Sequence, residues 1–212
     1  MTPRPPTGPA TWPTNKNTRH RPGTRPRVHR VTMRCVMATL AMLFLTTTSA
    51  NAVDLTGTHW EEAARSAGLD PLILYAVALT ESGRLERSGQ IKPWPWTLNI
   101  EGRAHFTDTR KEAAALLAAH RGKSMDVGLL QVNTRWHGHR IDDVEALLEP
   151  AINLEIGASI LEEALTSAPG DLTAGIGRYH SGRPEHALPY ARTVLSFYRF
   201  LLHNEKTERA SP

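Results

Sequence analysis

The sequence predicts a mostly helical α+β domain that carries one small β-hairpin. Residues 71–82 form an apolar stretch with helix signals at both ends, and Thr58 and Thr109 each begin a further Thr-x-x-Glu capping box. Two short β-leaning runs flank a two-residue turn that ends in Gly102, which is typical of a hairpin. A chain of 212 residues is long enough for one such domain with an appendage.

The positive charge of the chain is confined to its beginning. The sequence pI of about 9.5 suggests a nucleic-acid partner, but eight of the 25 Lys and Arg residues lie before Val53, where there is no Asp or Glu. The rest of the chain then holds 17 basic against 21 acidic residues, a formal charge of −4. Because this part lacks a basic excess, we expect no nucleic-acid partner.

The beginning of the chain has the features of a cleaved secretory signal. An apolar run over residues 36–45 follows Arg34 and precedes the small-x-small tripeptide 50–52, and the run is too short to cross a bilayer. We predict cleavage after Ala52 and an exported, periplasmic protein. Because a signal of this length is unusual, Met33 is a candidate for the true start of translation. The alternative is a retained basic arm that anchors the protein.

The chain divides into a leader, a folded domain and a short tail. We place the leader over residues 1–52, the domain over residues 53–204 and a polar tail over residues 205–212. Cys35, the only cysteine, lies in the leader, so the exported chain has no disulfide and depends on its apolar core for stability. We expect a monomer.

The helix over residues 71–82 is the best defined element. Asp70 can cap its free amides, Pro71 suits its first position, and Gly83 offers a left-handed stop. Residues 72–79 are apolar on every face, which predicts a helix in the core of the domain.

Helix signals divide the rest of the chain into short elements. One helix begins at Thr58 and stops at Gly68, and another begins at Thr109 and reaches His120. Gly157 lies on a helix face that another helix can approach closely. The remaining elements that we expect are the hairpin strands 97–100 and 103–106, a short helix 142–148, and the helices 150–167, 171–180 and 189–203.

Glu81 is the only acidic residue inside the core helix, and it lies in the last turn. Desolvation by apolar neighbours and the negative end of the helix dipole both oppose ionisation, so both raise the pKa of this carboxyl. A carboxyl that stays protonated near neutral pH is suited to general acid catalysis. From these residues alone, a solvated Glu at a helix end is the alternative.

Four short motifs follow one another along the chain. They are Glu81-Ser82, Gly-Leu-Leu-Gln-Val-Asn at 128–133, Asn-Leu-Glu-Ile-Gly at 153–157 and Gly-Arg-Tyr-His-Ser-Gly at 177–182. This order resembles the lysozyme-like domain of soluble lytic transglycosylases, whose signatures are Glu-Ser, Gly-Leu-Met-Gln, Asn-x-x-x-Gly and Ala-Tyr-Asn-x-Gly. The resemblance extends over residues 59–198 and implies a lysozyme-like helical domain with a small β-hairpin insertion.

The resemblance implies roles for three residues. Glu81 matches the single catalytic acid/base of the family. Gln131 matches a residue that contacts substrate, and Tyr179 matches a tyrosine whose hydroxyl orients the catalytic carboxyl. The implied reaction is the cleavage of peptidoglycan strands between N-acetylmuramic acid and N-acetylglucosamine with closure of a 1,6-anhydro ring, which makes the enzyme a carbon–oxygen lyase without a cofactor.

Three further residues are candidates for contact with substrate. Ser82 either terminates the helix or touches sugar, and Asn133 either caps a loop-to-helix junction or touches sugar. His180 stands where the family has Asn, so a hydrogen bond from that amide must come from an imidazole or be absent. Trp94 and Trp96 form either a sugar-stacking rim or a local core.

Two other activities are alternatives. Glu101, Asp108 or Asp126 could position a water molecule opposite Glu81, which would make the enzyme a hydrolase like goose-type lysozyme. The second alternative is a non-catalytic scaffold that binds peptidoglycan.

Metal binding is not expected from this sequence. The segment Trp136-His-Gly-His139 brings two imidazoles together, but no further zinc ligands accompany them, so we expect surface histidines.

The long stretch between Gly83 and Asp126 is similar to inserts of transglycosylases that accompany conjugative or type IV secretion machines. Subunits of such a machine are therefore expected partners besides peptidoglycan.

Overall fold

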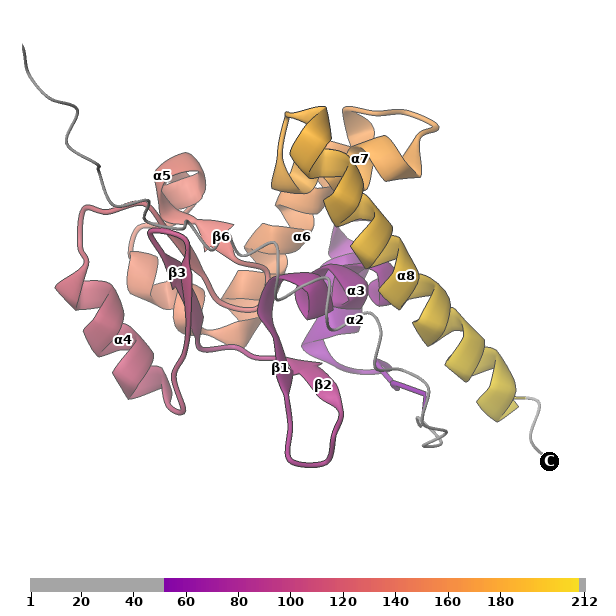
Figure 1. Cartoon of the computed structure of the whole chain (residues 1–212), viewed down its shortest axis with the longest axis horizontal. Coiled ribbons are helices and arrows are strands. Elements are labelled where there is room, and N and C mark those ends of the chain that lie inside the picture. The colour runs from indigo at the N-terminus through magenta and orange to yellow at the C-terminus, as the bar shows by residue number, and fades with distance from the viewer. Residues whose placement is uncertain (1–51, 210–212) are drawn as a thin grey trace, which may run out of the picture.

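The computed structural model describes residues 52–209 and confirms the predicted fold, a mostly helical domain with a small antiparallel sheet (Figure 1). The expected signal sequence and the alternative start at Met33 lie outside the described residues. Within the described residues, no helix has the length and apolar character that a membrane span needs.

The helices and strands alternate in short segments. The α-helices are α2 (His59–Ser66), α3 (Pro71–Ser82), α4 (Arg110–Ala119), α5 (Thr134–His137), α6 (Pro150–Thr166), α7 (Leu172–His180) and α8 (Pro184–Arg209). Two 3₁₀ helices are η1 (Gly138–Arg140) and η2 (Val144–Leu148). The strands are β1 (Gly83–Leu85), β2 (Ile91–Pro93), β3 (Thr97–Ile100), β4 (Arg103–Phe106), β5 (Met125–Val127) and β6 (Val132–Asn133).

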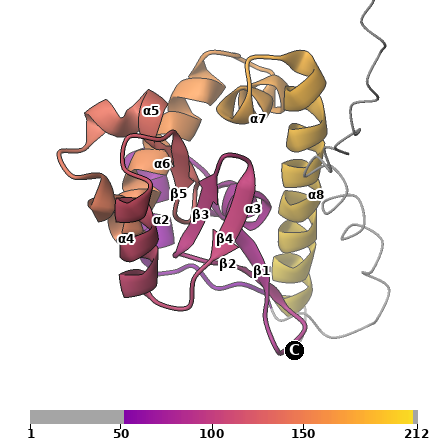
Figure 2. The ribbon, with the colours of Figure 1, turned by 60° about the vertical axis from the view of Figure 1, so that its left-hand side comes forward.

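Helix α3 occupies the centre of the helical part, as predicted. It contacts α2, α8 and the strands β1 and β2, and Figure 2 shows it between α8 and the sheet. Its N-terminus is capped by Asp70, whose carboxylate accepts a hydrogen bond from the Leu72 amide at 2.8 Å. Leu74, Val77 and their neighbours are fully buried, so the core assignment is confirmed.

The predicted left-handed stop at Gly83 is wrong. Gly83 has a φ of −58° and begins β1, which pairs with β2. A Cβ atom at this position would lie 2.3 Å from the Leu79 carbonyl oxygen. Glycine is therefore needed for a close approach to the last turn of the helix and not for a positive φ.

The predicted hairpin is confirmed as β3 and β4. Its turn residues Glu101 and Gly102 have φ values of 53° and 81°, as expected of a tight two-residue turn with two left-handed positions. The sheet has the order β4-β3-β5-β6, and β1 and β2 form a separate pair. The sequence did not predict β1, β2, β5 and β6, because two or three residues show no alternation of polar and apolar side chains.

Three helix ends differ from the prediction. The Thr58 side chain does not cap α2, because its hydroxyl bonds to the Leu55 carbonyl instead. Helix α8 begins before the predicted start at Pro189, which lies inside the helix. The same helix continues through most of the predicted polar tail at 205–212. In contrast, the capping box at Thr109 is confirmed, with both reciprocal hydrogen bonds to Glu112.

The loop of residues 128–131, here called the glutamine loop, joins the two apolar cores of the domain. Val127 and Val132 on either side belong to the core under the sheet, whereas Leu129 and Leu130 belong to the core around α3. Gly157 on α6 is close to Leu130, because an added Cβ atom would lie 2.3 Å from a Leu130 methyl group. The neighbour that Gly157 accommodates is thus a loop side chain and not the expected second helix.

Asn153 on α6 holds the glutamine loop in place through hydrogen bonds to its backbone. Its side chain is 1 % exposed and accepts a hydrogen bond from the Leu130 amide at 2.9 Å. Its amide group donates to the carbonyl oxygens of Val127 at 2.8 Å and Leu147 at 2.9 Å. One buried side chain thereby forms hydrogen bonds with three backbone groups from three segments of the chain.

We predict that Asn153→Ala lowers the free energy of unfolding by about 3 kcal/mol, because it leaves one amide and two carbonyls buried without partners. Urea denaturation of the purified domain measures this. The matched control is Asn204→Ala near the end of α8, which should change stability by no more than about 0.5 kcal/mol. Equal stability of the two variants would contradict this role of Asn153.

Candidate active site

Glu81 is a half-buried carboxyl in the last turn of α3. Desolvation is the largest cause of a rise in its pKa from 4.5 to about 8. Hydrogen bonding to the Tyr190 hydroxyl opposes this rise, and the negative charge of Asp126 adds to it. At neutral pH the carboxyl is therefore mostly protonated, as the sequence predicted from its position in an apolar helix.

Two tyrosines lie beside Glu81. Tyr179 on α7 and Tyr190 on α8 have rings nearly parallel, at 20°, with centroids 6.5 Å apart. Burial raises the pKa of both phenols, and the charge of Glu81 raises each further. The Tyr190 hydroxyl is buried and makes no hydrogen bond of regular geometry to any described residue, so Glu81 is the polar group it faces.

Tyr179 and Ser82 both bind the backbone of the glutamine loop. The Tyr179 hydroxyl donates to the Leu130 carbonyl at 2.6 Å, and the Ser82 hydroxyl lies 2.7 Å from the Leu129 carbonyl. Ser82 is fully buried, so a sugar cannot reach its side chain in this arrangement. The expected substrate contact of Ser82 is thus corrected to a structural tie between α3 and the loop.

Gln131 has a positive φ of 45° at the end of the glutamine loop. Its side-chain amide donates both protons to the protein, to the carbonyl oxygens of Thr97 at 3.0 Å and Gly128 at 2.9 Å. The side-chain oxygen of Gln131 is then free to accept a hydrogen bond from a sugar hydroxyl or an acetamido N–H.

Asn133 is the N-cap of α5. Its side-chain oxygen accepts from the amides of Arg135 at 3.0 Å and Trp136 at 3.2 Å, and its amide donates to Asp126 at 2.6 Å. Of the two roles considered from the sequence, capping is the one that the geometry supports. Asn133 also positions Asp126, its direct cross-strand neighbour on β5.

Asp126 is the second carboxyl of the site, whereas the other two acidic candidates lie elsewhere. Desolvation raises the pKa of Asp126, and the hydrogen bond from Asn133 opposes this rise. Asp108 is exposed and pairs with Arg84 at 3.2 Å, and Glu101 pairs with Lys123 at 3.1 Å in the hairpin turn. The structure therefore brings Glu81 and Asp126 together and leaves Glu101 and Asp108 out.

Comparison with known families supports the same assignment. The family model for the transglycosylase SLT domain matches residues 58–188, which include all four motifs. The chain belongs to the SLT transglycosylase family. In the comparison with curated proteins, nothing matches the chain. Membership of this family indicates a lytic-transglycosylase type of activity on peptidoglycan.

His180 occupies the position of the Asn in the SLT motif Ala-Tyr-Asn-x-Gly. Its ring stacks on Tyr190 with a centroid distance of 4.5 Å and an interplanar angle of 7°. Desolvation and the neighbouring His186 lower the pKa of His180, so the neutral form predominates at pH 7. Within the described residues its ring makes no hydrogen bond, so its observed contact is the stack on Tyr190.

The two tryptophans of the insert pack against each other and against the protein. Trp94 and Trp96 meet edge to face at 5.5 Å, and the Arg84 guanidinium lies 3.3 Å above the Trp94 ring centre. The Trp94 indole N–H also bonds to the Thr107 carbonyl at 2.7 Å. These contacts favour the local core over a free sugar-stacking rim.

Tyr190 is the site residue that the sequence analysis missed. It lies in the regular apolar pattern of α8 with Ala191 and Val194, so it looks like a packing residue. One signal was available, since a phenol within an otherwise apolar helix face needs a polar partner when it is buried.

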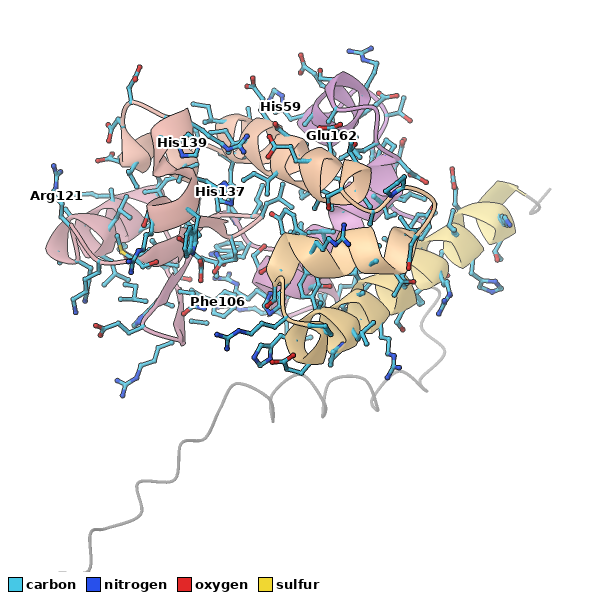
Figure 3. All side chains as sticks on the ribbon, turned by 90° about the horizontal axis from the view of Figure 1, so that it is seen from above. His59, Phe106, Arg121, His137, His139 and Glu162 are labelled. Atoms are coloured by element: carbon cyan, nitrogen blue, oxygen red, sulfur yellow. The ribbon has the colours of Figure 1, made fainter. Side chains whose placement is uncertain are left out.

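No group of three or more potential metal ligands occurs within residues 52–209. His137 and His139 lie on α5 and η1 (Figure 3), and the charge of Glu163 acts on His137.

The elevated pKa of Glu81 predicts how stability depends on pH. Between the unfolded pKa near 4.5 and the folded pKa of about 8, the native state holds a proton that the unfolded state has lost. The free energy of unfolding contributed by Glu81 therefore falls as the pH rises through this window. Glu81→Gln removes this pH dependence. The free energy of unfolding of the variant, relative to that of the parent, should therefore increase by roughly 3 kcal/mol from pH 5 to pH 9, after allowance for partial exposure. Thermal unfolding at the two pH values measures this, and a difference independent of pH would contradict the elevated pKa.

Proposed function

We propose that this protein is a lytic transglycosylase that cleaves the β-1,4 bond between N-acetylmuramic acid and N-acetylglucosamine and releases a 1,6-anhydro product. The observation that carries the proposal is the Glu81 carboxyl, which is protonated at neutral pH because its pKa is about 8. A binding scaffold has no need of such a group, whereas an acid catalyst does.

In the first step, Glu81 donates its proton to the glycosidic oxygen as the bond from that oxygen to the muramic C1 breaks. N-acetylglucosamine leaves as an alcohol, and positive charge develops at C1. The acetamido group of the muramic acid can stabilise this charge, so the protein need not supply a nucleophile. The buried Tyr190 hydroxyl faces Glu81 and can donate a hydrogen bond to the carboxylate that results, which stabilises it.

In the second step, the Glu81 carboxylate accepts the proton of the muramic C6 hydroxyl, whose oxygen bonds to C1. The carboxyl returns to its protonated form, and no water is consumed. One residue can serve both steps because its pKa lies near the working pH. Gln131 and the two tyrosines contribute only uncharged groups to the site, so Asp126 is the second charged group beside Glu81.

Hydrolysis is the second candidate, and Asp126 is the observation that favours it. Its charge acts on Glu81, so the two carboxyls form a pair like the acid and base of an ordinary glycosidase. However, the Asp126 carboxylate already accepts a hydrogen bond from Asn133 at 2.6 Å, and its pKa is raised. The hydrogen bond from Asn133 occupies the carboxylate and weakens it as a base for activating water, whereas the raised pKa alone would strengthen it.

We propose that the enzyme acts in the periplasm, after removal of the leader at Ala52. The apolar run at residues 36–45 and the small residues at 50–52 support export. We also propose that it opens the wall locally for a conjugation or secretion machine. The support for this role is the long insert between α3 and β5, which holds the β1–β2 and β3–β4 pairs and α4.

Product analysis tests the activity. We expect digestion of purified sacculi to release muropeptides that are lighter by one water than the products of a lysozyme. Glu81→Gln should lower the rate of release by about 10²–10⁴-fold, because it removes the carboxyl that donates the proton.

Asp126→Asn is the matched control for the hydrolase alternative. A transglycosylase should still release anhydro products after this change. Reducing ends from the parent enzyme, lost in Asp126→Asn, would establish hydrolysis instead. No release by the parent would leave the scaffold role.

A further inference from the structure

A pocket of about 500 Å³ lies on the face of the sheet to which Met125 of β5 points. The end of α4, the start of β5, the start of α5 and η2 surround it. Leu117, Met125 and Val144 supply apolar parts of its lining. This size is within the range of small-ligand sites in proteins.

Two arginines line this pocket without an ion pair. Neither the Arg121 nor the Arg135 side chain forms a salt bridge or a hydrogen bond to any residue within 52–209, apart from a distant contact of Arg135 with the Trp136 ring at 6.0 Å. In contrast, Lys123 and Glu145 in the same lining pair with Glu101 and Arg110. Unpaired guanidinium groups beside an apolar surface are suited to carboxylates, which they can bind through two hydrogen bonds.

The lining of the pocket also holds acidic residues, namely Asp142, Asp143 and Glu145. Asp142 forms no ion pair with any residue that the structure describes. A ligand with carboxylates toward the arginines and an amino group toward Asp142 would satisfy all three side chains. Short peptides that contain an acidic and a diamino residue have this chemistry.

The pocket is connected to the catalytic site through two hydrogen bonds. Ser124 lines the pocket, and its hydroxyl lies 3.2 Å from the Asn133 amide, which in turn donates to Asp126. Met125 and Asp126 are successive residues of β5, so their side chains point to opposite faces of the sheet. β6 packs against α5 and α6, so its outer edge is covered, whereas the strand ends, at the exposed Ser124 and the half-buried Asn133, offer a way from one face to the other.

We propose that this pocket binds the stem peptide that branches from the glycan strand under cleavage. The proposal rests on the proposed function, because that function supplies peptidoglycan as the substrate. A stem of four residues extends at most about 14 Å, enough to pass Ser124, which lies two residues before Asp126 in the sequence and lines the pocket. Arg121 lies at the edge of the molecule that is far from α8 (Figure 3).

Two substrates test the proposal, namely intact sacculi and glycan strands from which an amidase has removed the stem peptides. The double variant Arg121→Ala/Arg135→Ala should release product from intact sacculi about tenfold more slowly than the parent at low substrate concentration. Its rate on the stripped strands should equal that of the parent. The matched control is Arg103→Ala, an exposed arginine on β4 that does not line the pocket and should leave both rates unchanged.

Equal rates of parent and double variant on intact sacculi would overturn the proposal, and so would an equal loss on both substrates. If the parent cleaves neither substrate, the proposed function fails, and calorimetric titration with the free stem tetrapeptide decides the inference separately. The parent should then bind the tetrapeptide and the double variant should not. Equally tight binding of an unrelated acidic peptide would overturn the stem-peptide assignment in favour of a protein partner.

Discussion

The hydrogen bonds that hold the glutamine loop are the constraint on which the rest of the site depends. Loop carbonyls accept bonds from Ser82 and Tyr179, and the Leu130 amide donates to Asn153. Each of these three side chains comes from a different helix and from a different sequence motif. The loop therefore acts as a common anchor that places the end of α3, the start of β6 and the end of α7 around one point.

The catalytic chemistry follows from this placement because it controls the solvation of Glu81. With the loop and α7 fixed against the end of α3, the carboxyl loses part of its contact with water and its pKa rises to about 8. The negative charge of Asp126 adds to this rise in pKa, and the Tyr190 hydroxyl, which faces Glu81, limits it by stabilising the carboxylate. The balance leaves Glu81 able to give up a proton and to take one back near neutral pH, as a single acid/base requires.

Local signals predicted the parts of this structure that local interactions determine. Asp70, Pro71 and the apolar run after them specify α3 without help from the rest of the chain, and the Glu101-Gly102 turn specifies its hairpin. Ser82 and Tyr190 could not be assigned in the same way, because their roles depend on groups that are far away in sequence. Gly83 was misinterpreted for the same reason, since its constraint is a close contact and not a backbone angle.

The central claim is that Glu81 keeps its proton at neutral pH in the folded enzyme. The most direct test is a pH titration of the Glu81 side-chain carboxyl by carbon NMR, with the signal assigned from its absence in Glu81→Gln. A midpoint near 8 is expected. A midpoint between about 4 and 5, the range of a solvated glutamate, would contradict this account.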